Sequence, residues 1–279
     1  MKVFLSGYGK MGKLIEEMAK EKGWTVVGKA DVTCPEVYET APAADVCMDF
    51  SGVGALPHLA AYVRRTKTPL LSGTTGLTEP DFDELRALAK LVPVIWAANY
   101  STGIAVLRRM LRDYAAVLSE WDKEIVEIHH NQKVDAPSGT AKLLLQELDP
   151  DGQATVLHGR EGLCGKRSEG EIGVFSLRGG TVAGEHTVYF FGEDETLKLT
   201  HTAASRKIFV AGALRAAQAH VLVKDVGRFT GRAHDRILVA RGVLVGRDVL
   251  DVVVRAVERR TDQLGHRGID DHQLAARGG

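Results

Sequence analysis

Residues 124–141, EIVEIHHNQKVDAPSGTA, gather titratable side chains directly before the start of a helix. Two adjacent histidines, His129 and His130, are followed by Lys133. Histidine titrates near neutral pH, and burial can lower the pKa of a lysine, so either type of side chain could donate a proton. The pattern favours a strand in which Glu127 and His129 share one face and His130 points to the other.

A metal site and a structural histidine are the alternatives for this pair. Side chains at adjacent strand positions diverge, and no cysteine or carboxylate stands at the spacing of a zinc protease, so we expect no metal. A lone histidine is most often a partly buried ring with satisfied hydrogen bonds. Lys133 follows three residues after His130, which favours a shared polar pocket.

The residues that follow predict a helix entered through Pro137, with Ser138, Gly139 and Thr140 in its first turn. Backbone amides in a first turn, together with the helix dipole, bind anions. The alternative is a capped helix in which Asp135 or Ser138 binds the backbone, and both can hold together. A cationic His/Lys group beside such amides suits a small substrate that carries carboxylates.

A glycine loop near the N-terminus predicts a dinucleotide site. GYGKMG places Gly7, Gly9 and Gly12 as G-x-G-x-x-G between a strand and a helix. These glycines permit a tight turn, close approach to a pyrophosphate, and close helix–strand packing. A purely structural turn is the alternative.

The residue that closes the second strand bears on the choice of dinucleotide. Asp31 could accept hydrogen bonds from a ribose diol, which favours NAD, or could be a simple turn residue. Lys29 or Lys10 could instead meet a 2′-phosphate, which favours NADP. The sequence leaves this preference open.

Alternating strands and helices predict the parallel sheet that would position these groups. Strands are expected at residues 2–6, 24–31, 44–51, 68–76 and 92–101, and helices at 11–23, 56–66 and 79–91. Each strand ends in Gly, Asp, Ser, Thr or Asn, where ligands collect in open α/β sheets.

The pattern changes after about residue 102. A longer helix is predicted over 103–121, antiparallel hairpins over 173–203 around a Gly-Glu-Asp-Glu turn, and a further helix over 205–223. We expect a dinucleotide-binding domain at 1–101, completed by about 206–250, an α+β substrate domain at 102–205, and a tail at 251–279.

The composition limits the classes of partner. The chain has 279 residues, is 44% hydrophobic and 26% charged, and carries no formal net charge, so we expect neither nucleic-acid nor membrane partners. Its three cysteines form no CxxC pair, which argues against a zinc ribbon and a disulfide framework. The apolar run at the N-terminus is too short for a signal peptide, so we expect a cytoplasmic protein.

The opening segment resembles one family closely, 4-hydroxy-tetrahydrodipicolinate reductase (dihydrodipicolinate reductase). It matches the motif E-x-x-E-x-H-H-x-x-K-x-D-x-P-S-G-T-A at every defining position. GYGKMG, DFS at 49–51, SGTTG at 72–76 and ANYSTG at 98–103 are also similar. GEHTVYF and SRKIFVAGALRAA extend the resemblance to about residue 217.

The resemblance implies an NAD(P)H-dependent oxidoreductase of lysine and diaminopimelate biosynthesis. It would reduce 4-hydroxy-tetrahydrodipicolinate to tetrahydrodipicolinate with loss of water, using NADH or NADPH. His129 matches the proton donor and acceptor and Lys133 the proton donor, and which proton each supplies stays open. The implied substrate contacts are His130, Ser138, Gly139 and Thr140. The implied cofactor contacts are Gly7, Gly9, Lys10, Met11 and Gly12 at the pyrophosphate, Asp31 at the ribose, and Gly73, Thr74, Thr75, Ala98, Asn99 and Tyr100 at the nicotinamide half.

The resemblance also implies an architecture, namely a Rossmann-like dinucleotide-binding domain and an α+β domain with a mixed open sheet. The family is typically a homotetramer joined through the sheets of this second domain. The C-terminal part departs from the family pattern, since no lysine follows Lys224 and no aromatic residue follows Phe229. This indicates a divergent C-terminus or a displaced reading frame.

Two other functions compete with the reductase. Another two-domain Rossmann reductase, such as an aspartate-type amino-acid dehydrogenase, would share the glycine loop but would not require the histidine, lysine and Pro-Ser-Gly-Thr group. A non-catalytic dinucleotide-sensing regulator is hard to reconcile with an intact His129 and Lys133.

Overall fold

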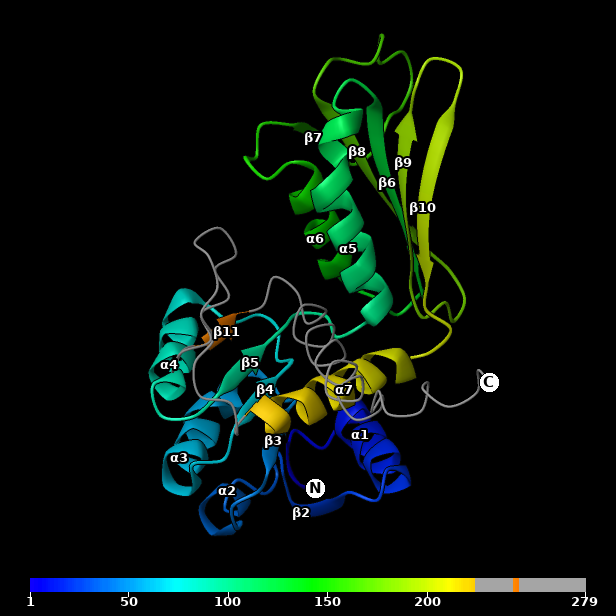
Figure 1. The fold of residues 1–279 in the computed structure, drawn as a ribbon. Coiled ribbons are helices and arrows are strands. Elements are labelled where there is room, and N and C mark those ends of the chain that lie inside the picture. The colour runs from blue at the N-terminus through cyan, green and yellow to red at the C-terminus, as the bar shows by residue number, and fades with distance from the viewer. Residues whose placement is uncertain (224–242, 246–279) are drawn as a thin grey trace, which may run out of the picture.

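The first of two sheets is six-stranded and parallel, in a computed structural model that describes residues 1–223 and 243–245 (Figure 1). Its order is β2-β1-β3-β4-β5-β11. The strands are β1 (Lys2–Ser6), β2 (Thr25–Ala30), β3 (Val46–Asp49), β4 (Leu70–Ser72), β5 (Val94–Trp96) and β11 (Val243–Val245). The helices around it are α1 (Lys10–Glu21), α2 (Val37–Thr40), α3 (Leu56–Thr66), α4 (Glu79–Ala89) and α7 (Lys207–Val223), with a short 3-10 turn at Val53–Ala55.

Helices cover both faces of this sheet, which is why its strands are continuously apolar. One core lies under α1 and α7, and the other lies under α2, α3 and α4. The strand order reverses beside β1, because β2 pairs with one edge of β1 and β3 with the other. Ligands bind at such a switch point, at the carboxyl ends of the strands. The predicted Rossmann-like architecture is confirmed.

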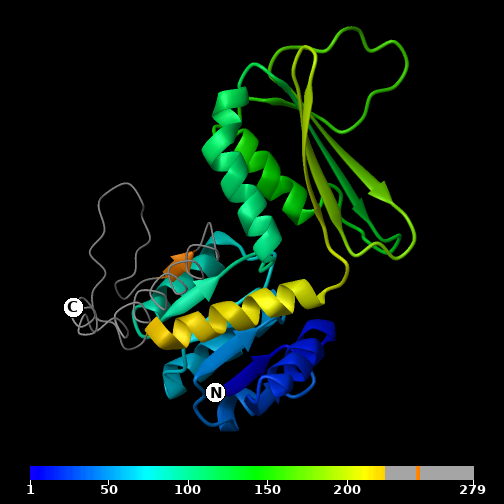
Figure 2. The same ribbon diagram turned by 45° about the vertical axis from the view of Figure 1, so that its right-hand side comes forward.

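The second sheet is mixed and has the order β10-β9-β6-β8-β7. Its strands are β6 (Asp122–His129), β7 (Thr155–Leu157), β8 (Glu171–Arg178), β9 (Glu185–Phe191) and β10 (Thr196–Thr202). Helices α5 (Thr102–Tyr114), continued by a 3-10 turn (Ala115–Leu118), and α6 (Gly139–Leu148) pack on one face (Figures 1 and 2). The other face carries no helix among the described residues.

The expectation of hairpins over 173–203 is half right. β9 and β10 form the antiparallel hairpin around the Gly-Glu-Asp-Glu turn. β8 and β9 do not pair, because β6 lies between them and pairs parallel to β8 and antiparallel to β9. β6 belongs to an earlier part of the chain, so residues 173–203 carry no local signal of it. Their alternating pattern therefore could not reveal that β6 is inserted between β8 and β9.

The chain crosses twice between the two sheets. The first crossing enters α5, and the second follows β10 and leads into α7, which packs back on the first sheet. The Ser101 hydroxyl at the first crossing lies 3.1 Å from Nε2 of His201, which joins the two crossings. No helix in the described part of the chain is long and apolar enough to cross a bilayer. The expected tail at 251–279 lies outside the described residues, as does most of 224–250.

Candidate active site

The glycine loop at the end of β1 has two positions, Gly7 and Gly12, that only glycine fits. Gly7 has φ +89°, and a Cβ on it would lie 2.6 Å from the carbonyl oxygen of Phe50. A Cβ on Gly12 would lie 2.1 Å from the carbonyl oxygen of Gly7. The first and third glycines therefore hold the tight turn and the close contact between α1 and β1.

The start of α1 fits a dinucleotide pyrophosphate. Gly9 caps the helix without a side-chain hydrogen bond, and a Cβ there would have no neighbour within 4 Å. Amides of the first turn are thus left for a ligand at the positive end of the helix. Lys10 is exposed beside them, while Met11 packs partly against the core.

Asp31 directly follows β2 and stays at least partly accessible. One carboxylate oxygen, Oδ1, accepts from the backbone and hydroxyl of Thr33, and these bonds lower the pKa of Asp31. Lys29 points elsewhere, since its ammonium lies 3.4 Å from the Glu16 carboxylate and over the ring of Tyr8. Lys29 therefore already forms an ion pair with Glu16.

A buried carboxylate, which the sequence did not single out, ties the strand ends together. Asp49 accepts hydrogen bonds from the hydroxyls of Ser6 at 2.8 Å, Ser72 at 2.7 Å and Thr74 at 2.8 Å. The loop of Gly73, Thr74 and Thr75, which follows β4, is therefore also hydrogen-bonded to the end of β3 through Thr74. Asp49 lies in the DFS segment that carries the family resemblance, and the spacing of these residues does not predict its buried role.

The loop after β5 is split between buried and accessible residues. Tyr100 is buried and donates to the carbonyl oxygen of Ser72 at 2.7 Å, so its side chain belongs to the core. Ala98 is exposed. Asn99 donates through Nδ2 to the hydroxyl of Thr140 at 3.0 Å. This bond brings an expected cofactor contact from the first sheet against an expected substrate contact at α6.

Glu127 and His129 lie on the same face of β6, as the alternation predicted. Glu127 is fully buried, and its carboxylate is hydrogen-bonded to Nδ1 of His129. Arg178, at the end of β8, binds the same carboxylate through both terminal nitrogens at 2.9 and 2.8 Å. Arg178 was missed from the sequence because 51 residues separate it from Glu127 and only strand pairing brings the two together.

The electrostatics of this pair follow from burial and hydrogen bonding. Burial alone would raise the pKa of Glu127, but hydrogen bonds from Arg178 and then Ser176 and His129 outweigh it and lower that pKa to about 2. Burial lowers the pKa of His129, and the neighbouring Glu127 opposes that shift. Glu127 is therefore an ionised acceptor at neutral pH.

The segment after β6 carries the remaining predicted proton groups. Lys133 pairs with Asp135 at 2.6 Å, so Asp135 does not cap the following helix. His130 is partly buried, and its amide donates to the carbonyl oxygen of Val182 at 2.8 Å. Of the predicted proton groups, His129 is linked to the start of α6, because Glu127 bonds both its ring and the Ser138 amide.

Ser138 is the N-cap of α6 rather than part of its first turn. Its hydroxyl accepts from the amide of Ala141, and its own amide donates to Glu127 at 3.1 Å. The expectation that the Ser138 amide grips a substrate carboxylate therefore conflicts with this geometry. Among the described residues, no acceptor takes the amides of Gly139 and Thr140, and the space around Gly139 is open.

A third histidine, His186, lies beside His129. His186 on β9 is buried, with Nε2 3.0 Å from the Ser138 hydroxyl and its ring 5.1 Å from that of His129. Burial first, and then the neighbouring His129, lower the pKa of His186 to about 3. Gly184 lies against Nε2 of His129, since a Cβ on it would stand 3.1 Å from that nitrogen. Gly184 and His186 both lie within GEHTVYF, whose sequence pattern predicts no role for either residue.

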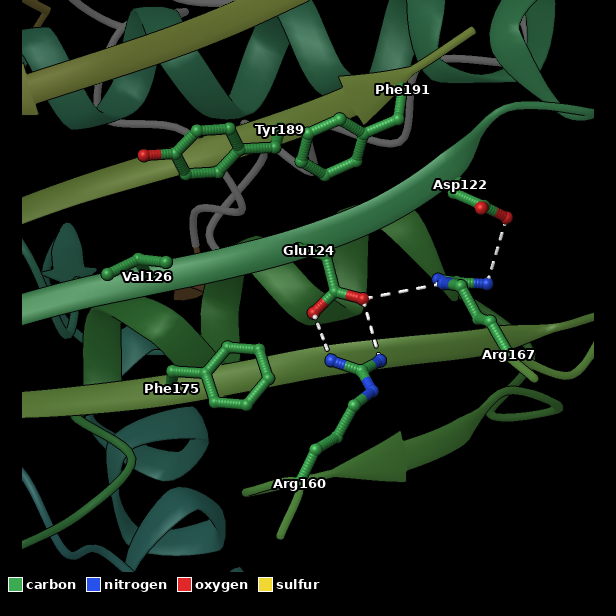
Figure 3. A pocket seen from close by; sticks show the side chains of 8 residues that line it. All are labelled: Asp122, Glu124, Val126, Arg160, Arg167, Phe175, Tyr189 and Phe191. Carbon is green, nitrogen blue, oxygen red and sulfur yellow. Dashed lines mark hydrogen bonds and ion pairs between the residues drawn. The ribbon is translucent and has the colours of Figure 1, made fainter. Parts of the chain in front are cut away.

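The opposite face of the second sheet has a different character. Strand alternation turns Glu124 and Val126 away from the His129 side (Figure 3). A hollow there is lined by Asp122, Glu124, Val126, Arg160, Arg167, Phe175, Tyr189 and Phe191. Arg160 and Arg167 bind Glu124 at 2.9 and 3.4 Å, beside the stacked rings of Tyr189 and Phe191. No group of His, Cys, Asp and Glu suited to a metal ion occurs in the parts of the chain that the structure describes.

Two family models match almost all of the described chain. Residues 1–100 match "Dihydrodipicolinate reductase, N-terminus", and residues 103–233 match "Dihydrodipicolinate reductase, C-terminus". Relatives named 4-hydroxy-tetrahydrodipicolinate reductase include one from Exiguobacterium sibiricum, 39% identical over 82% of this chain and 94% of its own length. Another from Clostridium novyi is 41% identical over 82% of this chain and 96% of its own length.

Solved structures show the same fold at low sequence identity. A dipicolinate-bound dihydrodipicolinate reductase from Paenisporosarcina sp. TG-14 is 21% identical, with TM-score 0.60 over 80% of this chain and 95% of that one. The DAP dehydrogenase of C. glutamicum in complex with DAP is 13% identical, with TM-score 0.51 over 96% of this chain and 99% of that one. The architecture is thus shared with an amino-acid dehydrogenase, and the fold by itself does not separate the two activities.

Proposed function

The chain belongs to the dihydrodipicolinate reductase family, and we propose that it reduces 4-hydroxy-tetrahydrodipicolinate through the residues gathered around the start of α6. The product is tetrahydrodipicolinate, formed with loss of water, and the electrons come from NADH or NADPH. This is a step of lysine and diaminopimelate biosynthesis, which we place in the cytoplasm. We assign residues 1–101 and 206–250 to dinucleotide binding and 102–205 to the substrate.

The observation that carries the proposal is the hydrogen bond between Asn99 and Thr140. It joins the loop after β5, to which we assign the nicotinamide half, to the start of α6, to which we assign the substrate, and so supports the proposal. Hydride transfer requires the two reacting atoms to lie within van der Waals contact, so cofactor and substrate sites must adjoin. An amino-acid dehydrogenase would share the fold, but it would not need this histidine and lysine group.

The cofactor, when bound, supplies a hydride from its nicotinamide ring. The amides at the start of α1 hold the pyrophosphate, and Gly7 and Gly12 keep the loop close to it. The loops at 73–75 and 98–100 hold the nicotinamide half. Here Asn99 and the backbone contribute, because the Tyr100 side chain is committed to the core.

We propose that NADH is preferred over NADPH. Asp31 keeps one carboxylate oxygen for a ribose diol, and its negative charge repels a 2′-phosphate. Lys29, which could have met that phosphate, is held by Glu16. Comparison of kcat/KM for the two cofactors tests this preference, and a higher value for NADPH would contradict it.

For the substrate, the amides of Gly139 and Thr140 receive a carboxylate at the positive end of α6, and His130 and Lys133 supply further polar contacts. His129 and Lys133 are the proton donors. Each stands on a different element, β6 for the histidine and the following segment for the lysine, so the two can serve different positions of the ring.

We further propose a homotetramer assembled through the uncovered face of the second sheet. Aromatic rings and an arginine–glutamate network lie on this face, away from the α5 and α6 core (Figure 3). Tyrosine, phenylalanine and arginine are enriched at subunit interfaces. Phe191 is 39% exposed in the isolated chain, and a subunit contact on this face would bury it.

The experiment is an absorbance assay at the nicotinamide band, with substrate generated in situ from pyruvate and aspartate semialdehyde. We expect His129→Gln and Lys133→Ala each to lower kcat by roughly 10²-fold, the usual scale for positioned acid–base groups. Folded wild-type protein that oxidises neither NADH nor NADPH would refute the function. Wild-type kcat in both variants would refute the roles.

A further inference from the structure

We propose that Glu127 and Arg178 form a positioning pair that sets the orientation of His129 and the start of α6 together. This inference rests on the proposed function, which assigns proton donation to His129 and carboxylate binding to the start of α6. Glu127 is fully buried, and the Arg178 guanidinium is engaged by the Glu127 carboxylate. The pair acts through His129 and the start of α6.

The Glu127 carboxylate is filled by donors from three parts of the chain. Arg178 takes both oxygens, His129 shares Oε2, and the Ser138 amide takes Oε1 at 3.1 Å. Glu127 has no exposed surface. Because donors from these parts of the chain hold both oxygens of one buried carboxylate, a movement of Glu127 would displace the histidine and the helix N-terminus together.

This arrangement fixes the tautomer of the neutral His129 ring. An ionised carboxylate can only accept, so Nδ1 must carry a proton and donate it to Glu127. Nε2 is then the nitrogen left to exchange protons with a substrate. It lies on the side of Gly184, where the missing Cβ leaves room beside the ring.

Arg178 extends the pair to the loop that bears Lys133. Besides its two bonds to Glu127, it donates to the carbonyl oxygen of Asp135 at 2.8 Å. It also balances the charge of a carboxylate that would be costly to bury alone. The guanidinium thus holds the segment after β6 against the same carboxylate that holds His129.

The charges that face His129 come from several elements. Burial lowers its pKa, Glu127 on its own strand raises it, and Lys133 and Arg178 lower it. His186 on β9 faces the ring edge-on at 5.1 Å. Removal of the anion and removal of the cation should therefore shift the pKa of His129 in opposite directions, which a merely structural role would not produce.

The test measures the pKa of His129 in the full-length protein without cofactor, by histidine C2–H exchange and mass spectrometry. In Glu127→Gln we expect this pKa to fall, and in Arg178→Met to rise, each by about one unit, the scale for a close charge. Glu185→Gln is the matched control, since it removes a carboxylate on β9 that bonds Thr202 instead. There the pKa should stay unchanged.

Kinetics give the second reading. In Glu127→Gln we expect kcat to fall about 10²-fold and the alkaline limb that His129 causes to move to lower pH. Arg178→Lys keeps the positive charge but loses the two-nitrogen contact with the Glu127 carboxylate. Because this contact helps to position the start of α6, we expect KM for the substrate to rise about tenfold. If Glu127→Gln does not fold, the arginine variants carry the test. An unchanged pKa, or shifts of the same sign in the two partners, would overturn the pair, whereas an inactive wild-type enzyme would overturn only the function.

Discussion

Replacement of His186 by glutamine should make the protein less sensitive to acid. His186 is 4% exposed, and its Nδ1 is buried without a hydrogen-bond partner among the described residues. A proton added there would place a charge in the core beside His129. Glutamine can keep the contact to the Ser138 hydroxyl but cannot take up this proton.

The magnitude follows from the pKa of His186, which burial lowers from 6.5 to about 3. Between these values the unfolded chain binds a proton that the native state does not, so stability is lost as the pH falls below 6.5. Each pH unit is worth about 1.4 kcal/mol. From pH 7 to pH 4.5 the titrating window spans about two units, so His186 costs the wild type about 3 kcal/mol. Glu127, whose pKa is lowered from 4.5 to about 2, loses its stabilising contribution mainly below pH 4.5 and is present in both proteins.

Urea unfolding at pH 7 and pH 4.5, at one protein concentration, measures the effect. The free energy of unfolding should fall by about 3 kcal/mol more in the wild type than in His186→Gln, whatever the variant loses at pH 7. His129 and His201 are also shifted by burial, but they remain in both proteins and largely cancel. His58→Gln, which alters an exposed ring on α3, should follow the wild type. Parallel pH dependences in wild type and His186→Gln would refute the reasoning.

Three other predictions concern glycines and the open sheet face. Gly12→Ala should raise the Kd for NADH at least tenfold, because its Cβ would stand 2.1 Å from the Gly7 carbonyl oxygen; a fluorescence titration checks this. Gly184→Ala would place a Cβ 3.1 Å from Nε2 of His129, on a backbone with φ +152°, and should lower kcat/KM by about tenfold or more. Activity equal to wild type would contradict this close contact. Phe191→Asp should dissociate the tetramer in light-scattering measurements, and an unchanged mass would show that this face is not the interface.

The sequence predicted the elements whose patterns are local. The helix over 56–66 has the bounds that were expected, because an apolar stripe and a proline near its start define it. The helix expected over 103–121 is α-helical only to Tyr114 and then tightens into a 3-10 turn. The short strand β7 was not anticipated, since three residues carry too little pattern to detect.

The site was predicted in its residues more fully than in its contacts. Alternation along β6 correctly put Glu127 and His129 on one face. It could not show that the Glu127 carboxylate would accept a hydrogen bond from the Ser138 amide, nor that the Tyr100 side chain would be buried in the core. Each of these depends on which groups meet across elements, and residue spacing carries no information about that.

The sequence by itself determined which residues face the same way, where a helix could bind an anion, and which family motif they form. These properties follow from the periods of strand and helix and from the chemistry of single side chains. Only the tertiary structure decided that Arg178 would meet Glu127 across 51 residues, that His186 would lie against Ser138, and that Asn99 would reach Thr140. The reason is physical: the insertion of β6 between β8 and β9 is selected by burial of the whole sheet under α5 and α6, and no local stretch of the chain records that choice.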